Sequence, residues 1–145
     1  MRPVRIACVA LAAALIGAAP ADLPQPLSMD VQGLRSARGA ILICVTQAPD
    51  HFPDCTADPN RRHFAVPASG QPIALGMLAP GSYAIALIHD ENGNGRLDTM
   101  LGIPREGVGF SGNPAIRFGA PSFRSARFVI TGAPMRQDVR VKYFL

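Results

Sequence analysis

The sequence predicts a single all-β domain, an antiparallel Greek-key β-sandwich of about seven strands with one long ordered loop. Short apolar runs alternate with polar residues, and turns rich in the chain's 14 glycines and 14 prolines separate these runs. No segment keeps a helical periodicity over three turns. A length of 145 residues suits one domain. A small β-barrel is the alternative architecture.

Residues 1–21 have the layout of a secretory signal peptide. A short basic segment precedes an uninterrupted apolar run over residues 6–17, and small residues lead up to Ala21. We expect cleavage after Ala21, which leaves residues 22–145 as the domain, in the periplasm or outside the cell. An uncleaved N-terminal anchor is the alternative. No later stretch is long and apolar enough to predict a transmembrane helix.

The distribution of charge argues against a nucleic-acid partner. The whole chain has a formal net charge of +4, and removal of Arg2 and Arg5 with the signal leaves +2. The remaining arginines are scattered along the sequence, whereas nucleic-acid binding favours a concentrated basic face. We therefore expect a partner in the envelope or outside the cell, whose identity the sequence does not give.

Two stretches predict the central strands. Ala40–Thr46 is rich in β-branched residues and apolar on both faces. Residues 82–90 follow a Pro-Gly turn, and their small alanines favour close packing against another layer. Further strands are expected over residues 28–34, 63–67, 72–78, 123–131 and 135–144.

Cys44 and Cys55 are expected to form a disulfide. They are the two of the three cysteines that remain after signal removal, and an exported chain meets an oxidising compartment. The bond would tie the proline-containing loop over residues 47–62 to a central strand and contribute roughly 3 kcal/mol on a chain-entropy model. Two free thiols are the alternative, because a metal pair would need a second Cys/His pair nearby.

Residues 90–124 are expected to form one long ordered loop. Their many glycines and several prolines disfavour both a helix and a regular sheet. Their leucines, isoleucines and phenylalanines are too numerous for a disordered linker. The loop is therefore predicted to pack over one end or face of the domain.

The beginning of this loop has the pattern of a cation-binding turn. When Asp90 is counted as the first position of an EF-hand-type loop, oxygen donors fall at the first, third, fifth, seventh and ninth positions and a glycine falls at the sixth. These hard oxygen donors suit Ca²⁺, the one cofactor that the sequence suggests. A metal-free Asn/Gly turn is the alternative, since the same residues bond their own backbone well. The candidate ligands are Asp90, Asn92, Asn94, Arg96 through its backbone carbonyl, and Asp98.

The twelfth position of the loop departs from the calcium-binding pattern. It should hold a bidentate glutamate, and it holds Leu101 instead. Glu106 is the nearby acidic residue that could replace it. The low charge of the set predicts weak affinity, with a Kd of roughly 10⁻⁴ to 10⁻³ M.

No catalytic set of residues can be assembled, so we expect a non-enzymatic module. His89 has no partner motif for base catalysis, and we expect its ring to brace the following loop. Ser111 lies in Gly-Phe-Ser-Gly, which lacks the final glycine of a nucleophile elbow. One alternative is an enzyme acting on envelope glycan or peptide, with His89, Asp90 and Glu106 at its centre.

A second alternative is a small-ligand or carbohydrate-binding protein. The long loop would then act as a lid, and an apolar pocket under Phe110, Phe118 and Phe123 would support this function.

Several stretches together resemble a family of exported bacterial proteins known only as a domain of unknown function. They are Pro-Gly-Ser-Tyr-Ala-Ile over 80–85, His-Asp-Glu-Asn-Gly-Asn-Gly-Arg-Leu-Asp over 89–98, Gly-Ile-Pro-Arg-Glu-Gly over 102–107, Gly-Phe-Ser over 109–111 and Phe-Gly-Ala-Pro-Ser-Phe over 118–123. The resemblance runs from about Val31 to the C-terminus and implies a secreted β-sandwich without an established activity. One departure is that Gly112-Asn-Pro114 replaces the family's Asn-Asn pair.

A more distant resemblance concerns the turn and loop alone. The Leu-x-Pro-Gly-x-Tyr turn, followed by a strand and an Asp/Asn loop, is similar to prealbumin-like modules of bacterial surface proteins, some of which bind calcium through such loops. It implies an immunoglobulin-like or prealbumin-like sandwich, although a shared fold does not transfer function.

Overall fold

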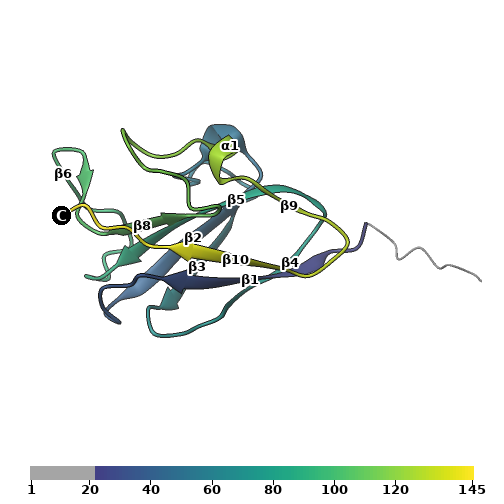
Figure 1. The fold of residues 1–145 in the computed structure, drawn as a ribbon, viewed down its shortest axis with the longest axis horizontal. Coiled ribbons are helices and arrows are strands. Elements are labelled where there is room, and N and C mark those ends of the chain that lie inside the picture. The colour runs from purple at the N-terminus through teal and green to yellow at the C-terminus, as the bar shows by residue number, and fades with distance from the viewer. Residues whose placement is uncertain (1–21) are drawn as a thin grey trace, which may run out of the picture.

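The computed structural model describes residues 22–145 (Figure 1), so the signal peptide predicted over residues 1–21 lies outside the described residues. The described part is mostly β, with one short α-helix and a 3-10 turn. The elements in order are β1 (Gln25–Gln32), β2 (Ala40–Thr46), η1 (Pro49–His51), β3 (Arg62–Pro67), β4 (Ile73–Leu78), β5 (Gly81–Asp90), β6 (Thr99–Met100), β7 (Ile103–Pro104), β8 (Gly107–Phe110), α1 (Phe123–Ala126), β9 (Phe128–Ile130) and β10 (Met135–Arg140).

The strands form two main sheets and one small hairpin. One sheet has the order β10-β1-β4 and the other the order β3-β2-β5-β8, with β9 paired to the start of β5. Strands β6 and β7 pair with each other as a hairpin, which projects at one end of the molecule (Figure 1). The two longest predicted strands are confirmed, β2 with the expected bounds and β5 one residue earlier than expected.

One strand pair differs from the expected antiparallel arrangement. β1 and β10 run parallel, with Leu27 opposite Met135 and Gln32 opposite Arg140, while the other pairs described between residues 22 and 145 are antiparallel. These are the first and last strands of the described residues. No hairpin turn joins them, so no turn geometry dictates their relative direction.

The two main sheets share one hydrophobic core. Alternate residues of β1, β2 and β5 point into it, as the period-two pattern of a strand requires. Burial of such aliphatic side chains contributes about 25 cal/mol for each Å² of apolar surface and is the main source of stability. The fully buried members include Leu27, Met29, Ile41, Ile43, Leu75, Leu78, Ile85, Leu87, Ile130 and Val139.

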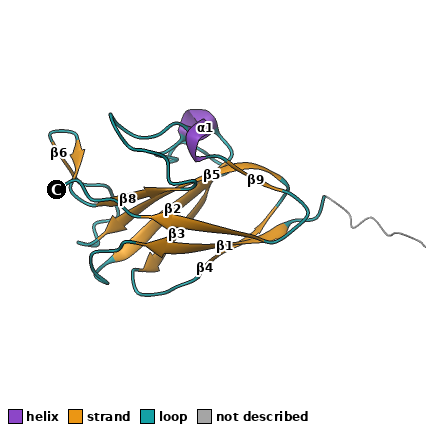
Figure 2. Cartoon of the chain, in the orientation of Figure 1, coloured by secondary structure: helices purple, strands orange, loops and turns teal. Residues whose placement is uncertain are grey.

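A second, smaller cluster lies on the opposite face of the larger sheet. Ala84, Ala86, Val108 and Phe110 from β5 and β8 pack there with Ala126 of α1. Partly buried residues of the loops complete the cluster, namely Phe52, Leu97, Ile116 and Phe123. Loops and α1 therefore cover this face of the sheet (Figure 2), as the small alanines of β5 indicated.

Strand β8 is the main correction to the predicted long loop. Gly107–Phe110 is buried throughout and pairs with β5 from Ala86 to His89. A Cβ on Gly107 would collide with Val141 and Tyr143, and one on Gly109 would lie 2.8 Å from Val139 Cγ1. The glycines are therefore present because the C-terminal segment crosses close to β8, and not because the chain turns there.

The strand predicted over residues 123–131 is wrong for its first part. Phe123–Ala126 forms α1, and only Phe128–Ile130 is a strand. Ser122 caps the helix, since its side chain accepts a hydrogen bond from the N–H of Ser125. This N-cap serine was the local signal for a helix start.

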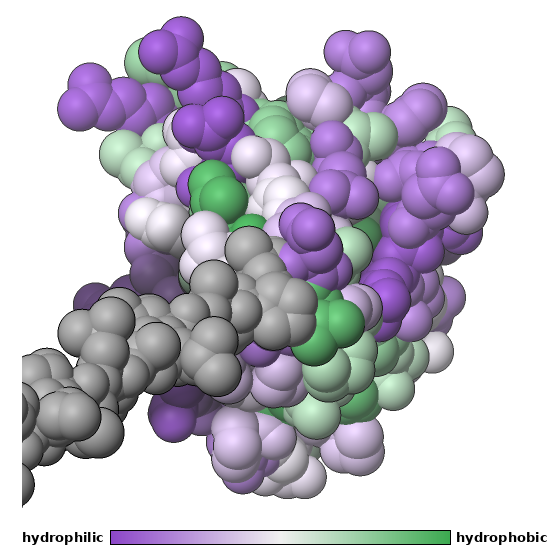
Figure 3. All heavy atoms as spheres, turned by 90° about the vertical axis from the view of Figure 1, so that its right-hand side faces the viewer, coloured by the Kyte–Doolittle hydropathy of each residue, from purple (hydrophilic) through white to green (hydrophobic). Residues whose placement is uncertain are grey.

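The two ends of the molecule differ in their exposed groups. Figure 3 views the end opposite the β6–β7 hairpin, where hydrophilic residues surround scattered apolar ones. At the hairpin end, Leu101 is 98% exposed and Phe118 is 102% exposed.

None of the helices described between residues 22 and 145 is long and apolar enough to cross a membrane.

Candidate metal centre

Asp90 ends β5 and organises the loop that follows it. Its carboxylate is buried, with only 1% of the residue exposed. Oδ1 accepts hydrogen bonds from the backbone N–H groups of Gly93 at 2.9 Å and Asn94 at 3.1 Å, and Oδ2 accepts one from Gly95 at 2.8 Å. The loop is thus wrapped around a buried negative charge.

Two asparagines place further oxygen atoms in the same loop. Asn92 Oδ1 accepts the N–H of Asn94 at 3.0 Å, and Asn94 Oδ1 accepts the N–H of Arg96 at 3.1 Å. Each carbonyl oxygen keeps a second lone pair for another partner. Gly95 has a φ of 78°, a left-handed conformation that glycine adopts without strain and that closes the turn.

Asp98 closes the loop through both asparagines. Its Oδ2 accepts hydrogen bonds from Nδ2 of Asn92 at 2.7 Å and of Asn94 at 2.8 Å. These two donors are the main reason why the pKa of Asp98 is lowered from its ordinary value. The Arg96 guanidinium is exposed, with Nε 3.6 Å from Asp98 Oδ1.

Glu106 approaches this loop from the residue before β8. Only 5% of the residue is exposed, and its Oε2 accepts the backbone N–H of Asp98 at 3.1 Å. The other carboxylate oxygen, Oε1, is buried and has no hydrogen-bond partner among the described residues 22–145. Burial raises the pKa of Glu106, and the nearby charges of Asp90 and Asp98 raise it further.

Glu106 has the carboxylate of Asp90 as a close neighbour. A protonated Glu106 would hydrogen-bond the Asp90 carboxylate, which is a further reason for its raised pKa. When both groups are ionised, neither carries a hydrogen and Oε1 is left unpaired. The space between Asp90 and Glu106 therefore favours a positive charge, which either a proton or a cation can supply.

The structure thus brings together the side chains of the predicted ligands Asp90, Asn92, Asn94 and Asp98, and adds Glu106 as their neighbour. It does so without a closed cage: within residues 22–145, no group of three or more His, Cys, Asp or Glu side chains is already arranged around one point. A cation here would rely on amide and backbone oxygens as well as on carboxylates.

Glu91 is turned away from this cluster and bonds to Arg35 and Ser36. Its Oε2 accepts from Nε of Arg35 at 2.9 Å and from Nη2 at 2.5 Å, while Oε1 accepts from the Ser36 hydroxyl at 2.8 Å. The pKa of Glu91 is lowered, chiefly by Arg35. The Arg35 guanidinium also lies 4.4 Å from the centroid of the Tyr143 ring.

Contrary to expectation, the side chain of His89 does not hydrogen-bond the following loop but instead joins Arg38 to Tyr143. It is fully buried, and Nε2 lies 2.9 Å from the carbonyl oxygen of Arg38. A carbonyl only accepts, so Nε2 carries the hydrogen, and Nδ1 accepts from the Tyr143 hydroxyl at 2.7 Å. Both ring nitrogens are engaged, which leaves none of them directed at an open cleft.

Ser111 is likewise used for internal bonding. The residue is fully buried, its Oγ donates to the carbonyl of Ala126, and it accepts the N–H of Ile85 at 2.9 Å. It therefore joins α1 to the central strand β5.

The loop over residues 47–62 is fixed at two points. Cys44 and Cys55 form the predicted disulfide. Sequence reasoning missed the second point, Asp58, which is buried and accepts hydrogen bonds from the Thr46 hydroxyl and the Asn60 N–H. These bonds lower the pKa of Asp58. The Asp-Pro-Asn sequence was the available signal, since Asp commonly bonds the N–H two residues later.

Comparison with known proteins gives a family but no activity. A family model described as "uncharacterized protein conserved in bacteria" (DUF2141) matches residues 29–138. The comparison with curated proteins and the comparison with solved structures each gave no match.

Proposed function

The chain belongs to the family of uncharacterised proteins conserved in bacteria (DUF2141), and we propose that it is an exported, non-enzymatic domain that binds Ca²⁺ weakly. The ion would be held by the loop from Asp90 to Asp98, with Glu106 supplying the ligand missing at the twelfth position. In this proposal the two facing sheets form a Greek-key β-sandwich, which serves as a rigid support for the loop.

The observation that carries the proposal is the buried, unpartnered Oε1 of Glu106 beside Asp90. Leaving a charged acceptor without a partner is costly, typically more than about 1–3 kcal/mol. A divalent cation between the two carboxylates would remove that cost and reverse the repulsion among Asp90, Asp98 and Glu106.

The donor set suits calcium better than magnesium. One oxygen from each of Asp90, Asn92, Asn94, Asp98 and Glu106, with the carbonyl of Arg96, would supply six oxygens, the lower limit of the roughly 6–8 that Ca²⁺ takes. Calcium tolerates such an irregular shell, whereas Mg²⁺ demands near-ideal octahedral geometry. To admit the ion, the amide hydrogens of Asn92 and Asn94 must swing away from Asp98, which favours the weak end of calcium affinities.

Export is supported by the signal pattern of residues 1–21 and by the Cys44–Cys55 disulfide, a bond that persists mainly in oxidising compartments.

A non-enzymatic role is supported by His89 and Ser111, whose polar atoms are already bonded inside the protein. An enzyme centred on His89, Asp90 and Glu106 would need His89 at an open cleft.

Calorimetric titration of residues 22–145 with calcium and with magnesium tests the proposal. We expect saturable calcium binding with a Kd of roughly 10⁻⁴ to 10⁻³ M and weaker magnesium binding. Glu106→Gln should weaken calcium binding about tenfold or more, as loss of a charged ligand does. Glu91→Gln is the matched control, because Glu91 is the chain's only other glutamate and points away from the loop. Equal effects of the two substitutions, or no binding at millimolar calcium, would contradict the proposal.

A further inference from the structure

A pocket of about 630 Å³ lies on the face of the larger sheet opposite the main core. Its size falls within the range of small-molecule sites. We propose that it binds an anionic amphiphile with a single alkyl chain, the chain lying on the sheet and the acidic head at the arginine rim. This inference does not require calcium binding, although residues 95–97 belong both to the cation loop and to the pocket lining. We call the cavity the sheet-face pocket, and its floor consists of Leu42, Cys44, Ala86, Ile88, Val108 and Phe110.

Strand pairing places the floor residues side by side in two rows. Leu42 is opposite Ile88, which is opposite Val108, and in the next row Cys44, Ala86 and Phe110 align in the same way. Both rows cross β2, β5 and β8 and present only apolar groups. Leu42 and Ile88 are only partly buried, although they lie on the two central strands of the sheet. An incompletely covered apolar floor of this kind suits an alkyl chain.

The walls come from two loops on opposite sides. Pro53 and Thr56 belong to the loop held by the Cys44–Cys55 disulfide, while Leu97, Ile103 and Ile116 come from the glycine-rich segment. Residues of the predicted lid therefore form part of the wall, but only one of the three expected phenylalanines, Phe110, lines the pocket. Phe118 is fully exposed, and Phe123 packs in the smaller cluster instead.

The rim has an excess of positive charge. Arg61, Arg96 and Arg117 line the pocket, and Asp54 is the single acidic residue among its lining groups. The Arg61 guanidinium donates to the backbone carbonyl of Asp58, and its charge also helps to lower the pKa of the Asp58 carboxyl. Arg117 is exposed and forms no ion pair within the described residues 22–145. This charge favours an acidic head group over a neutral or cationic one.

A carbohydrate suits this pocket less well. The two floor rows carry no hydrogen-bonding side chain except the disulfide sulfur of Cys44, and they offer one aromatic ring, Phe110. Sugar hydroxyls placed on such a floor would lose their hydrogen bonds to water.

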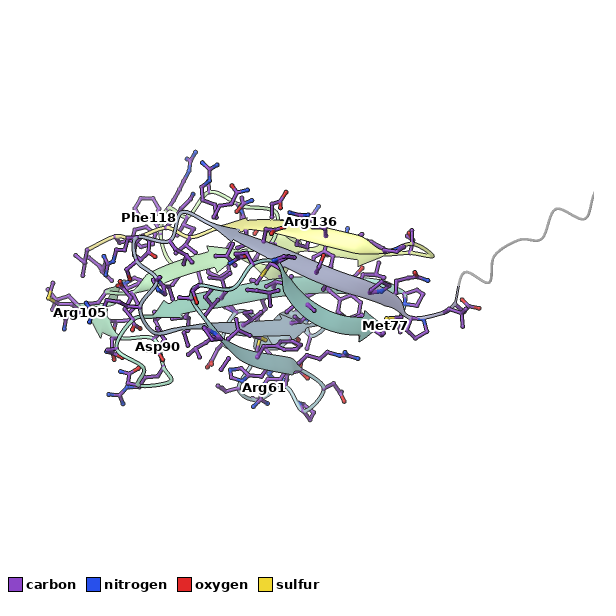
Figure 4. The ribbon with its side chains drawn as sticks, turned by 90° about the horizontal axis from the view of Figure 1, so that it is seen from below. Arg61, Met77, Asp90, Arg105, Phe118 and Arg136 are labelled. Atoms are coloured by element: carbon purple, nitrogen blue, oxygen red, sulfur yellow. A yellow bond between two sulfur atoms is a disulfide. The ribbon has the colours of Figure 1, made fainter. Side chains whose placement is uncertain are left out.

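The test uses a tryptophan as a reporter, because the chain contains none. Ile116→Trp places one on the pocket wall, and Met77→Trp places the control on β4 near the opposite end of the molecule (Figure 4). The probes are dodecanoate, dodecanol and dodecyltrimethylammonium, each below its micelle concentration. We expect a saturable emission shift with dodecanoate for Ile116→Trp only, with weaker binding of dodecanol and the weakest of dodecyltrimethylammonium.

Charge variants then test the head-group contact. Replacing Arg96 and Arg117 together by glutamine should weaken dodecanoate binding at least about fivefold and leave dodecanol binding unchanged. Arg140→Gln, on β10 of the other sheet, is the control and should have no effect. Carbon-13 methyl spectra of the unsubstituted chain provide a second measurement, in which dodecanoate should shift Leu42 and Ile88 but not Leu27.

Three results would overturn the proposal. The first is equal binding of dodecanoate and dodecyltrimethylammonium. The second is an equal response of the Ile116→Trp and Met77→Trp chains. The third is association with anionic phosphatidylglycerol vesicles without binding of monomeric dodecanoate, which would assign the affinity to the exposed Leu101 and Phe118 rather than to the sheet-face pocket.

Discussion

At the residue scale, the two glutamates of the chain have opposite surroundings. Glu91 is held by Arg35 and Ser36, which lowers its pKa, whereas burial and two carboxylate neighbours raise the pKa of Glu106. An ordinary surface acid would show neither shift. The pair is therefore an internal comparison between a glutamate that already has a positive partner and one that lacks it.

This contrast predicts how stability depends on pH in the absence of calcium. The raised pKa of Glu106 means that the folded state holds its proton to higher pH than the unfolded state does. The contribution of Glu106 to the stability of the folded state is therefore present below its pKa in the unfolded chain, about 4.3. This contribution is lost as the pH rises through its higher pKa in the folded state. The pKa of Glu91 is shifted in the opposite direction, so the contribution of Glu91 to stability is lost as the pH falls.

Glu106→Gln should consequently stabilise the calcium-free protein at neutral pH by about 1–3 kcal/mol, because the amide can donate to Asp90 where the ionised carboxylate cannot. Urea unfolding of residues 22–145 in the presence of a chelator measures the change. Glu91→Gln should destabilise under the same conditions because it removes the charged partner of Arg35. Destabilisation by both substitutions would show that Glu106 has a structural role alone.

At the scale of elements, strand β8 shows how packing overrides local preference. Its two glycines favour a loop when the sequence is taken alone, yet Val139, Val141 and Tyr143 cross so closely that a side chain at Gly107 or Gly109 would not fit. The segment is a strand because pairing with β5 and burial under the C-terminal residues outweigh the entropic cost of glycine.

Gly107→Ala should therefore destabilise the domain by about 1–3 kcal/mol through overpacking, even though alanine restricts the unfolded chain more than glycine does. Gly70→Ala is the matched control, since a Cβ there would meet no atom within 4 Å. We expect the control to be neutral or slightly stabilising. Chemical denaturation of both variants provides the comparison, and equal stabilities would refute the packing explanation for β8.

Elements formed by a continuous local pattern were predictable from the sequence, and those fixed by long-range contacts were not. β2 and β5 are apolar runs bounded by turns and are buried on both faces, so their bounds followed from the residues. α1 is a single turn set by the Ser122 cap, too short to show a helical period. The parallel direction of β1 and β10 depends on how the chain ends meet, which local patterns do not encode.

The same distinction applies to the candidate metal centre. The spacing of Asp90, Asn92, Asn94 and Asp98 is local, so the sequence identified them as a group. Glu106 is eight residues beyond Asp98, and its role depends on β8 returning to pair with β5, a long-range contact. The sheet-face pocket depends on pairing across three strands, which the sequence does not encode locally. The sequence indicated it only through the apolar faces of β2 and β5 and the apolar residues of the long loop.

At the scale of the whole molecule, one central sheet supports both candidate sites. β5 ends at Asp90, and its outer face forms part of the floor of the sheet-face pocket. Residues 95–97 belong to the cation loop and also line the pocket. Asp90 and Arg105 lie toward the same end of the molecule in Figure 4, whereas Met77 lies toward the other. The cation loop thus lies toward one end of the domain, and the pocket extends from it along the central sheet.

The most direct test of the proposed cation site is the titration of Glu106 itself. Because the chain has two glutamates, carbon-13 labelling of glutamate Cδ gives two carboxyl signals, and Glu91→Gln assigns them. Without calcium, we expect Glu106 to titrate above the ordinary value and Glu91 below it. With saturating calcium, the Glu106 transition should move to lower pH while that of Glu91 stays in place. A Glu106 titration that calcium does not change would contradict the cation site.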